Sequence, residues 1–261
     1  MIKTWLVSGD THGDTVRYSR FKSYKNPEEV AMIILGDTAF NYELNYNDTV
    51  RKRMASAYGG YIYCVRGNHE ERPENVKNMI KEWDSNVCGF VYMEHDFPLI
   101  RYFIDGERYL IDGHSVLVLG GAYSVDKPYR LMRGAKWFAR EQLSQEEMDA
   151  ISRKYVGEKI DLILSHTCPL SWQPTDLFLR GIDQSSVDTS MEQWMELFKD
   201  SIDFKVWLFG HYHHDRIVRP GVEMCYENIE ELKYIMDFWK NDSFEKLHPK
   251  KSLDPKYDRG R

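Results

Sequence analysis

Five short apolar runs, each ending abruptly in a polar loop, constrain the fold of this chain more than any other feature. They are residues 2–7, 31–35, 61–65, 161–164 and 205–209. Short runs rich in apolar and β-branched residues and bounded by turn residues are typical of strands buried on both faces. Two segments of helical character, 15–24 and 47–58, separate the first three runs. This alternation predicts an α/β fold that contains parallel strands.

The rest of the chain predicts further elements around this framework. Predicted helices cover 73–83, 143–155, 191–199 and 229–239, and predicted strands cover 100–104, 108–111, 116–119, 216–219 and 222–226. The short strands in the middle indicate a mixed or second sheet. The last helix has an apolar stripe formed by Leu232, Ile235, Met236 and Trp239. We therefore predict one domain over 1–227, a C-terminal amphipathic helix over 228–240 packed on it, and a polar tail over 241–261.

The charge balance and the apolar content exclude several classes of protein. With 35 Lys and Arg against 41 Asp and Glu, the formal net charge is −6, so the chain lacks the basic character of a general nucleic-acid or anionic-membrane binder. No apolar run approaches the roughly 20 residues that span a bilayer, and the opening residues turn polar too early for a signal peptide. The four scattered cysteines form no C-x-x-C pair, which favours reduced thiols. We expect a cytoplasmic protein with no membrane partner.

Each of the five predicted strands is followed at once by residue types that bind metal ions. These residues are Asp10, His12, Asp37, Asn68, His166, His211 and His213. The first intervals, 27 residues from Asp10 to Asp37 and 31 from Asp37 to Asn68, match βαβ units. Because parallel strands present their carboxyl ends at one edge of a sheet, we expect these side chains to converge there.

The donor atoms of this set indicate which metals it suits. Carboxylate, imidazole and amide groups without thiolates suit a pair of divalent ions, with Mn expected first and Fe, Zn or Ni as alternatives, better than one structural zinc. Asp37 is the natural bridging carboxylate between two ions. Paired ions bind phosphoryl oxygens and make hydroxide available near neutral pH, so the expected reaction is phosphoester hydrolysis.

In this order, the blocks D-x-H, G-D, G-N-H-E, a lone H and G-H-x-H resemble the signature of the calcineurin-like metallophosphoesterase superfamily over roughly residues 1–226. The resemblance implies a four-layer α-β-β-α sandwich of two mixed sheets with a dinuclear metal site at the strand carboxyl ends. It also implies the ligands of each ion, which are Asp10, His12, Asp37 and His213 for one and Asp37, Asn68, His166 and His211 for the other.

The same resemblance implies a role for a histidine outside the ligand set. His69 is similar to the outer-sphere histidine of the superfamily, which contacts the phosphate and protonates the leaving oxygen. An imidazole is suited to this general-acid role because its ordinary pKa lies close to neutral pH. The implied nucleophile is a hydroxide that bridges the two ions and attacks phosphorus in line.

The second block departs from the branch that the first and third blocks resemble most, that of the protein phosphatases and diadenosine tetraphosphatases. That branch has G-D-x-V-D-R-G, in which the later Asp supports the catalytic histidine and the Arg binds phosphate. Here Phe40 and Asn41 occupy the two places, so the chain is more similar to bacterial or phage members than to protein phosphatases. Asn41 itself remains a candidate substrate-binding residue. Within 120–133, Lys127, Arg130 and Arg133 are candidates to replace the missing arginine; the alternative is that they are solvated surface charges.

Three functional hypotheses follow from these motifs. The favoured one is a metal-dependent phosphoesterase that acts on a phosphorylated small molecule, a nucleotide or a phosphoprotein. The second is a phosphodiesterase or nuclease with the same metal chemistry, which the acidic balance disfavours for DNA. The third is a non-catalytic interaction scaffold, which would be expected to lack ligands, whereas the full ligand set is present.

Overall fold

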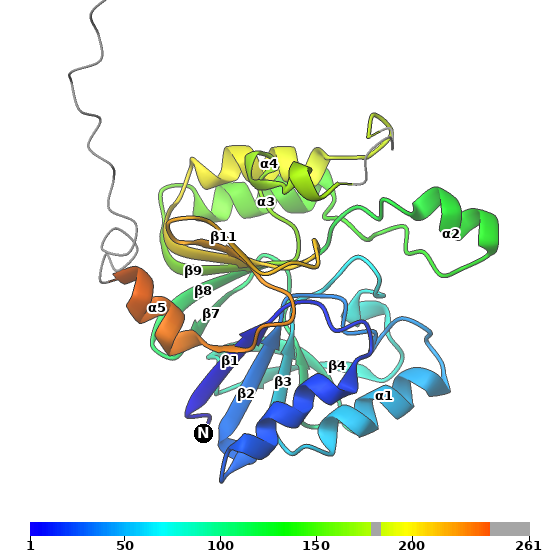
Figure 1. Cartoon of the computed structure of the whole chain (residues 1–261), viewed down its shortest axis with the longest axis vertical. Coiled ribbons are helices and arrows are strands. Elements are labelled where there is room, and N and C mark those ends of the chain that lie inside the picture. The colour runs from blue at the N-terminus through cyan, green and yellow to red at the C-terminus, as the bar shows by residue number, and fades with distance from the viewer. Residues whose placement is uncertain (179–183, 241–261) are drawn as a thin grey trace, which may run out of the picture.

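Two β-sheets packed face to face form the body of the protein, and helices cover their outer faces (Figure 1). The computed structural model describes residues 1–178 and 184–240, so the predicted tail over 241–261 lies outside the described residues. The predicted α/β sandwich of two mixed sheets is confirmed. Among the described residues, no helix combines the length and the apolar character that crossing a bilayer requires.

The first sheet has the order β13-β1-β2-β3-β6-β5-β4. Its strands are β1 (Thr4–Ser8), β2 (Val30–Ile34), β3 (Tyr61–Cys64), β4 (Met79–Asp84), β5 (Gly89–Glu94), β6 (Ile100–Tyr102) and β13 (Glu230–Glu231). Strands β1, β2, β3 and β6 run parallel, and the remaining pairings are antiparallel. All five residues of β2 are buried, as expected for an unbroken apolar strand covered on both faces.

The second sheet has the order β11-β12-β10-β9-β8-β7. Its strands are β7 (Arg108–Ile111), β8 (His114–Leu119), β9 (Lys159–Ser165), β10 (Asp203–Phe209), β11 (Arg216–Arg219) and β12 (Val222–Met224). The four central strands run parallel, and β7 and β11 are antiparallel edges. As in the first sheet, the parallel strands bring their carboxyl ends to one edge.

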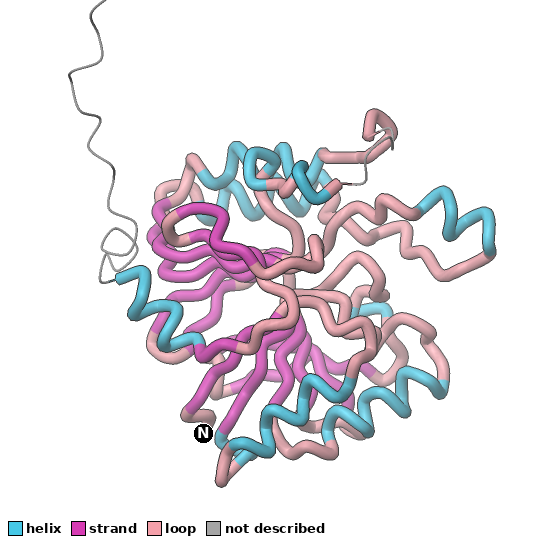
Figure 2. The backbone as a smooth tube through the Cα atoms, viewed as in Figure 1, coloured by secondary structure: helices cyan, strands magenta, loops and turns pink. Residues whose placement is uncertain are grey.

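The helices lie outside the two sheets (Figure 2). The elements are η1 (Thr15–Ser23), η2 (Pro27–Glu29), α1 (Tyr46–Ser56), η3 (Pro73–Asn75), α2 (Lys127–Arg133), α3 (Gln145–Tyr155), η4 (Leu170–Trp172), η5 (Thr175–Leu177), α4 (Ser190–Lys199) and α5 (Leu232–Lys240). Helices η1 and α1 pack on the first sheet, and α3 and α4 on the second. Helix α2 projects from the body on an arm, and α5 lies beside the sandwich (Figure 1).

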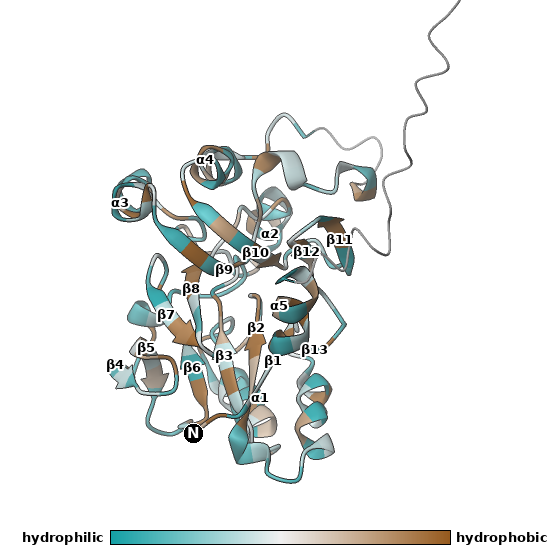
Figure 3. Ribbon diagram, turned by 90° about the vertical axis from the view of Figure 1, so that its left-hand side faces the viewer, coloured by the Kyte–Doolittle hydropathy of each residue, from teal (hydrophilic) through white to brown (hydrophobic). Residues whose placement is uncertain are grey.

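The largest apolar core lies between the two sheets. It joins residues of β1, β2 and β3 to residues of β8, β9 and β10, and α5 adds Leu232, Ile235 and Met236 to it. Hydrophobic residues, coloured brown in Figure 3, accordingly lie mainly on the strands and on one side of the packed helices.

The prediction of a helix over 73–83 is wrong. Only Pro73–Asn75 are helical, as one 3₁₀ turn, and Met79–Asp84 form β4. Asn78 has a left-handed φ of 66°, which breaks any helix at that point. The following residues pair with β5, and Trp83 meets Phe90 with ring centroids 5.3 Å apart. Pairing with β5, the next strand of the same hairpin, therefore overrides the local helical pattern.

Two other helix predictions differ in detail. The helix expected over 15–24 is a 3₁₀ helix, Thr15–Ser23. The helix expected from 229 begins at Leu232, because Glu230 and Glu231 first pair with β1 as an antiparallel edge strand. This edge strand brings α5 against the strands of the central core.

Candidate metal centre

The five loops that carry the predicted ligands meet where the carboxyl ends of the two sheets face each other. Asp10 and His12 follow β1, Asp37 follows β2, and Asn68 and His69 follow β3. From the second sheet, His166 follows β9, and His211 and His213 follow β10. Hydrogen bonds join the loops directly: the His211 amide donates to Asp10, and the His69 amide donates to Asp37.

Glycines before the ligands are needed because the loops approach one another closely. A Cβ at Gly36 would overlap the His166 ring, one at Gly67 would overlap Asp37, and one at Gly210 would overlap Asp10. Only a residue without a side chain lets the strand ends close to this separation. The glycines of the sequence blocks thus have a structural reason in the packing of one ligand against the next.

Several ligand candidates themselves have left-handed backbone conformations. The φ angles are 46° at His12, 48° at Asp37, 69° at His211 and 52° at His213. Non-glycine residues seldom adopt this region, and such residues cluster at functional sites. Here the conformation accompanies a sharp change of chain direction directly after a strand, at the edge where the side chains gather.

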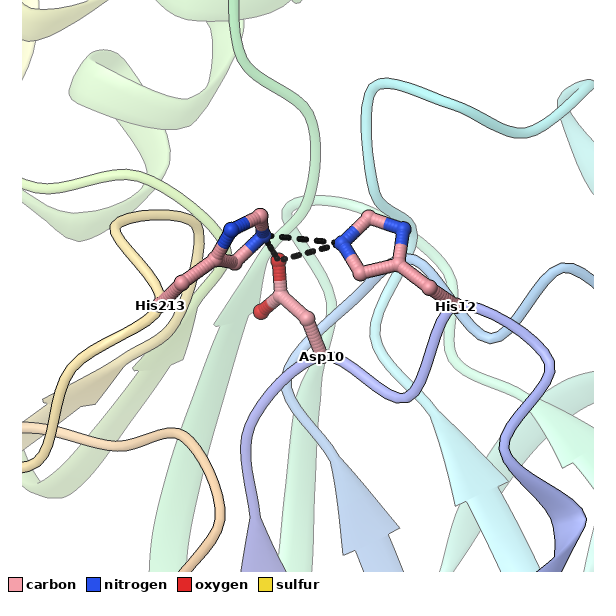
Figure 4. Close-up of side chains that lie close together, drawn as sticks. All are labelled: Asp10, His12 and His213. Atoms are coloured by element: carbon pink, nitrogen blue, oxygen red, sulfur yellow. Dashed lines mark hydrogen bonds and ion pairs between the residues drawn. The ribbon is translucent and has the colours of Figure 1, made fainter.

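Each of the two carboxylates uses one oxygen for structure and presents the other to the centre. Asp10 Oδ1 accepts a 2.9 Å bond from the His211 amide, and Asp37 Oδ1 accepts a 2.8 Å bond from the His69 amide. Asp10 Oδ2 is buried and accepts no well-formed hydrogen bond from the described residues. The Nε2 atoms of His213 and His12 lie 3.3 and 3.8 Å from it (Figure 4).

On the other side of the centre, two hydrogen-bond acceptors face each other. His166 Nδ1 lies 2.7 Å from the Leu35 carbonyl, which only accepts, so Nδ1 carries the proton. Burial lowers the pKa of His166, so the ring is neutral and Nε2 has a free lone pair. This Nε2 lies 2.7 Å from Asn68 Oδ1, while Asn68 Nδ2 donates to Ser124. No proton is available between these two acceptors, whereas a cation would bind both.

The pKa changes of the Asp10 and Asp37 carboxyl groups also indicate a site for a cation. Burial, and then the Asp10 carboxylate, raise the pKa of Asp37 well above its ordinary range. Burial acts the same way on Asp10, but the neighbouring His213 ring and the His211 amide outweigh it and hold the pKa of Asp10 low. Two groups, Asp10–His12–His213 and Asp10–Asp37–His166, each place their candidate ligand atoms within 4.8 Å of one another. The donor set is therefore suited to divalent cations.

His69 lies beside this centre and contacts the arm that carries α2. Its Nε2 is 3.9 Å from Asp37 Oδ2 and 3.3 Å from an Arg130 guanidinium nitrogen. Burial, followed by the Arg130 charge, lowers the pKa of His69 to about 3. In this arrangement the imidazole is neutral, so the charged form expected of a general acid is not the resting form.

Of the three cations predicted on 120–133, the structure brings Arg130 to the site. Its Nε donates a 2.7 Å bond to Asp126, and another nitrogen donates a 3.0 Å bond to the Tyr42 hydroxyl. Lys127 instead lies 4.1 Å from the centre of the Trp137 ring, and Arg133 lies 5.4 Å from that of Tyr129.

The two residues that depart from the family pattern are both buried. Phe40 is fully buried and stacks on Tyr18 with ring centroids 5.9 Å apart. Asn41 is also buried, and within the described chain its Oδ1 accepts no hydrogen bond. Sequence reasoning missed Tyr42 and Asp126, which hold Arg130, because neither belongs to a motif.

Comparisons with known proteins find a matching family and solved structures that cover most of the chain. The family model described as calcineurin-like phosphoesterase matches residues 4–215. A solved structure, TT1561 of Thermus thermophilus, has 12% identity and a TM-score of 0.44, covering 88% of this chain and 98% of that chain. Another has 11% identity and a TM-score of 0.46, covering 90% and 96%. No curated protein sequence matches the chain.

Proposed function

Because the chain belongs to the calcineurin-like phosphoesterase family, in which phosphoester hydrolysis depends on metal, we propose that it hydrolyses phosphoesters with two divalent cations. One observation carries the proposal: the buried acceptor atoms of Asn68 and His166 face each other with no proton between them, beside the buried carboxylate of Asp10. Such atoms are costly to bury unless a cation binds them.

We assign the ligand sets that the resemblance to the family implies. We assign one ion to Asp10, His12, Asp37 and His213, and the other to Asp37, Asn68, His166 and His211. Asp37 Oδ2 supports this division, since it lies 4.0 Å from His12 Nε2 and 3.7 Å from His166 Nε2, between the two groups. When bound, such a pair of ions supplies positive charge that polarises a phosphoryl oxygen and acidifies water. Mn is the first candidate, and Fe, Zn and Ni suit the same donors.

The chain's own side chains bind and orient the substrate. Arg130 supplies a guanidinium at the edge of the centre, held in place by Asp126 and Tyr42, and guanidinium groups bind phosphate oxygens with high geometric specificity. We assign it the phosphate contact that the arginine of the protein-phosphatase branch makes. His69 adjoins both Arg130 and Asp37, and we assign it the proton transfer to the leaving oxygen. Because the resting imidazole is neutral, this role requires that the ring take up a proton once the phosphate dianion is bound beside it. The extra cation favours a phosphomonoester, whose dianion carries more charge than a diester.

The test is metal-stimulated hydrolysis by protein that is first chelated and then reloaded with Mn²⁺. We expect p-nitrophenyl phosphate to be hydrolysed faster than bis-p-nitrophenyl phosphate. Arg130→Ala should raise KM for the monoester about 10-fold or more, which corresponds to a charge-assisted hydrogen bond. Arg108→Ala, which removes an exposed guanidinium on β7, serves as the matched control.

Three outcomes would each contradict a part of this proposal. Protein that binds no metal and shows no stimulated hydrolysis would favour the interaction scaffold. A preference for the diester would move the assignment to a phosphodiesterase, and an unchanged KM in Arg130→Ala would remove the phosphate-binding role from that residue.

A further inference from the structure

Two buried residues behind Asn68 form a hydrogen-bond relay that none of the sequence motifs includes. Ser124 and Glu141 are 1% and 3% exposed, and Asn68 is 2% exposed. Asn68 Nδ2 donates a 2.9 Å bond to Ser124 Oγ, and Ser124 Oγ donates a 2.6 Å bond to Glu141 Oε2. The Ser124 amide also donates a 3.1 Å bond to Glu141 Oε1. Glu141 therefore binds Ser124 through both of its carboxylate oxygens.

The chemistry of the three groups sets the direction of every bond. A carboxylate only accepts, and a serine hydroxyl has a single proton, which it gives to Glu141. Ser124 Oγ must therefore accept from Asn68, so the amide nitrogen of Asn68 faces Ser124. Its oxygen consequently faces His166 Nε2, at 2.7 Å. The orientation of this amide is thus determined by the relay, although the two ends of an amide have nearly the same shape.

The orientation matters because the opposite one is chemically attractive in the absence of metal. If the Asn68 amide turned over, its nitrogen would donate to the free lone pair of His166 Nε2. That arrangement would satisfy both groups with a hydrogen bond and would present N–H groups to the cation position. The relay opposes it, since turning the amide would set its oxygen against Ser124 Oγ, whose proton is already given to Glu141.

The relay also links the centre to the base of the α2 arm. Ser124 precedes α2 and Glu141 follows it, so their hydrogen bonds join the two ends of the segment that carries Arg130. Arg66, two residues before Asn68, reinforces this junction: it donates a 2.6 Å bond to the Glu141 carbonyl and a 2.7 Å bond to Asp105. The α2 arm, whose Arg130 contacts His69, and the side-chain amide of Asn68 are therefore both held by the buried Ser124–Glu141 pair.

We propose that Ser124 and Glu141 are positioning residues that hold the Asn68 oxygen in its metal-binding orientation and couple the α2 arm to metal binding. The inference rests on the proposed function, because it assigns Asn68 to one ion of the pair. Loss of an outer hydrogen-bond partner of a ligand lowers metal affinity by about 10- to 100-fold. Because coupling is reciprocal, metal binding should also order the arm.

The test compares Ser124→Ala and Glu141→Gln with the wild-type chain by calorimetric titration and electron paramagnetic resonance with Mn²⁺. Wild-type protein should bind two ions and give a spin-coupled spectrum. Each variant should bind one ion normally and lose about 10-fold or more in affinity for the other, so that a mononuclear spectrum persists at two equivalents. Glu141→Gln is close to isosteric, and its amide nitrogen donates where the carboxylate accepted.

Three further measurements separate positioning from general damage to the fold. Ser124→Thr keeps the hydroxyl, so it should bind the second Mn²⁺ ion with an affinity close to that of the wild type, unlike Ser124→Ala. Ser56→Ala, a matched loss of a buried hydroxyl that has no hydrogen-bond partner in the described structure, should bind as the wild type does. Hydrogen exchange of residues 125–140 should slow with Mn²⁺ in the wild type and less in Ser124→Ala.

The outcomes distinguish this inference from the proposed function. If the wild-type protein binds no Mn²⁺, the proposed function fails, and the relay proposal fails with it. If the wild type binds two ions and both variants bind them with unchanged affinity, only the relay proposal is overturned.

Discussion

A buried carboxyl group on α4 makes a testable contribution to stability that depends on pH. Glu192 is 3% exposed; its Oε1 accepts a 2.8 Å bond from Thr167, and its Oε2 has no hydrogen-bond partner in the described structure. Burial raises the pKa of Glu192 from 4.5 to about 6, with Asp188 adding to the rise and Thr167 and His166 opposing it. The folded protein therefore favours the protonated, neutral form.

The sign of the effect follows from the direction of this change. A carboxyl whose folded pKa is raised costs little while it is protonated in both states, and its cost appears as pH rises through 4.5 to about 6. Above that window the full difference amounts to about 2 kcal/mol of the free energy of unfolding. Glu192→Gln removes the ionisation, so it should gain stability relative to the wild type as pH rises.

The assay is urea unfolding of chelated protein at pH 4.5 and pH 8. The difference in free energy of unfolding between Glu192→Gln and wild type should grow in favour of the variant by about 1.5 kcal/mol between these values. Any constant cost of placing an amide in the pocket cancels in this comparison. Glu196→Gln is the control, because Glu196 lies one turn away and pairs with Lys199 at 2.7 Å. It should change stability by less than about 1 kcal/mol, and not in favour of the variant at pH 8.

This reasoning would be refuted if the difference in free energy of unfolding between Glu192→Gln and wild type did not depend on pH. It would also be refuted if the variant became less stable relative to the wild type at pH 8. Either result would mean that the ionised carboxylate is compensated in the folded protein. The expected increase would instead show that a charged group is held in a poorly solvated position directly behind the loop of His166.

The remaining predictions concern the metal centre. His69→Ala should keep both ions yet lose at least about 10²-fold in turnover, the usual scale of acid–base catalysis; turnover close to that of the wild type would contradict its assigned role. Asp37→Ala should lose metal, since it removes the carboxylate between the two ligand groups, and retention of two ions on elemental analysis would rule out its bridging assignment.

Much of the candidate site was predictable because local chemistry repeats at each strand end. Apolar runs followed by glycine and a metal-binding residue mark the ends of parallel strands, and parallel strands deliver those ends to one edge. The glycines before Asp37, Asn68 and His211 are part of the same pattern, since each removes a side chain that would overlap a neighbouring loop. The order of the loops and the residue types in them were therefore sufficient to group the candidate ligands.

Predictions failed where contacts between separate elements decide the outcome. Residues 79–84 have a local pattern compatible with a helix, yet pairing with β5 makes them a strand. Three basic residues on 120–133 were equivalent candidates, and only the packing of the arm brings Arg130 to His69, 61 positions away in sequence. Nothing in the local sequence distinguishes it from Lys127 or Arg133.

The sequence by itself determined the kind of chemistry, because backbone periodicity and the donor atoms of side chains are local properties. It specified buried parallel strands, glycine-bounded loops, and nitrogen and oxygen donors suited to divalent ions. Only the tertiary structure decided which groups support those donors. Ser124 meets Asn68 across 56 residues of sequence, and Glu141 directs that contact, because the orientation of a buried amide depends on partners that folding alone brings together.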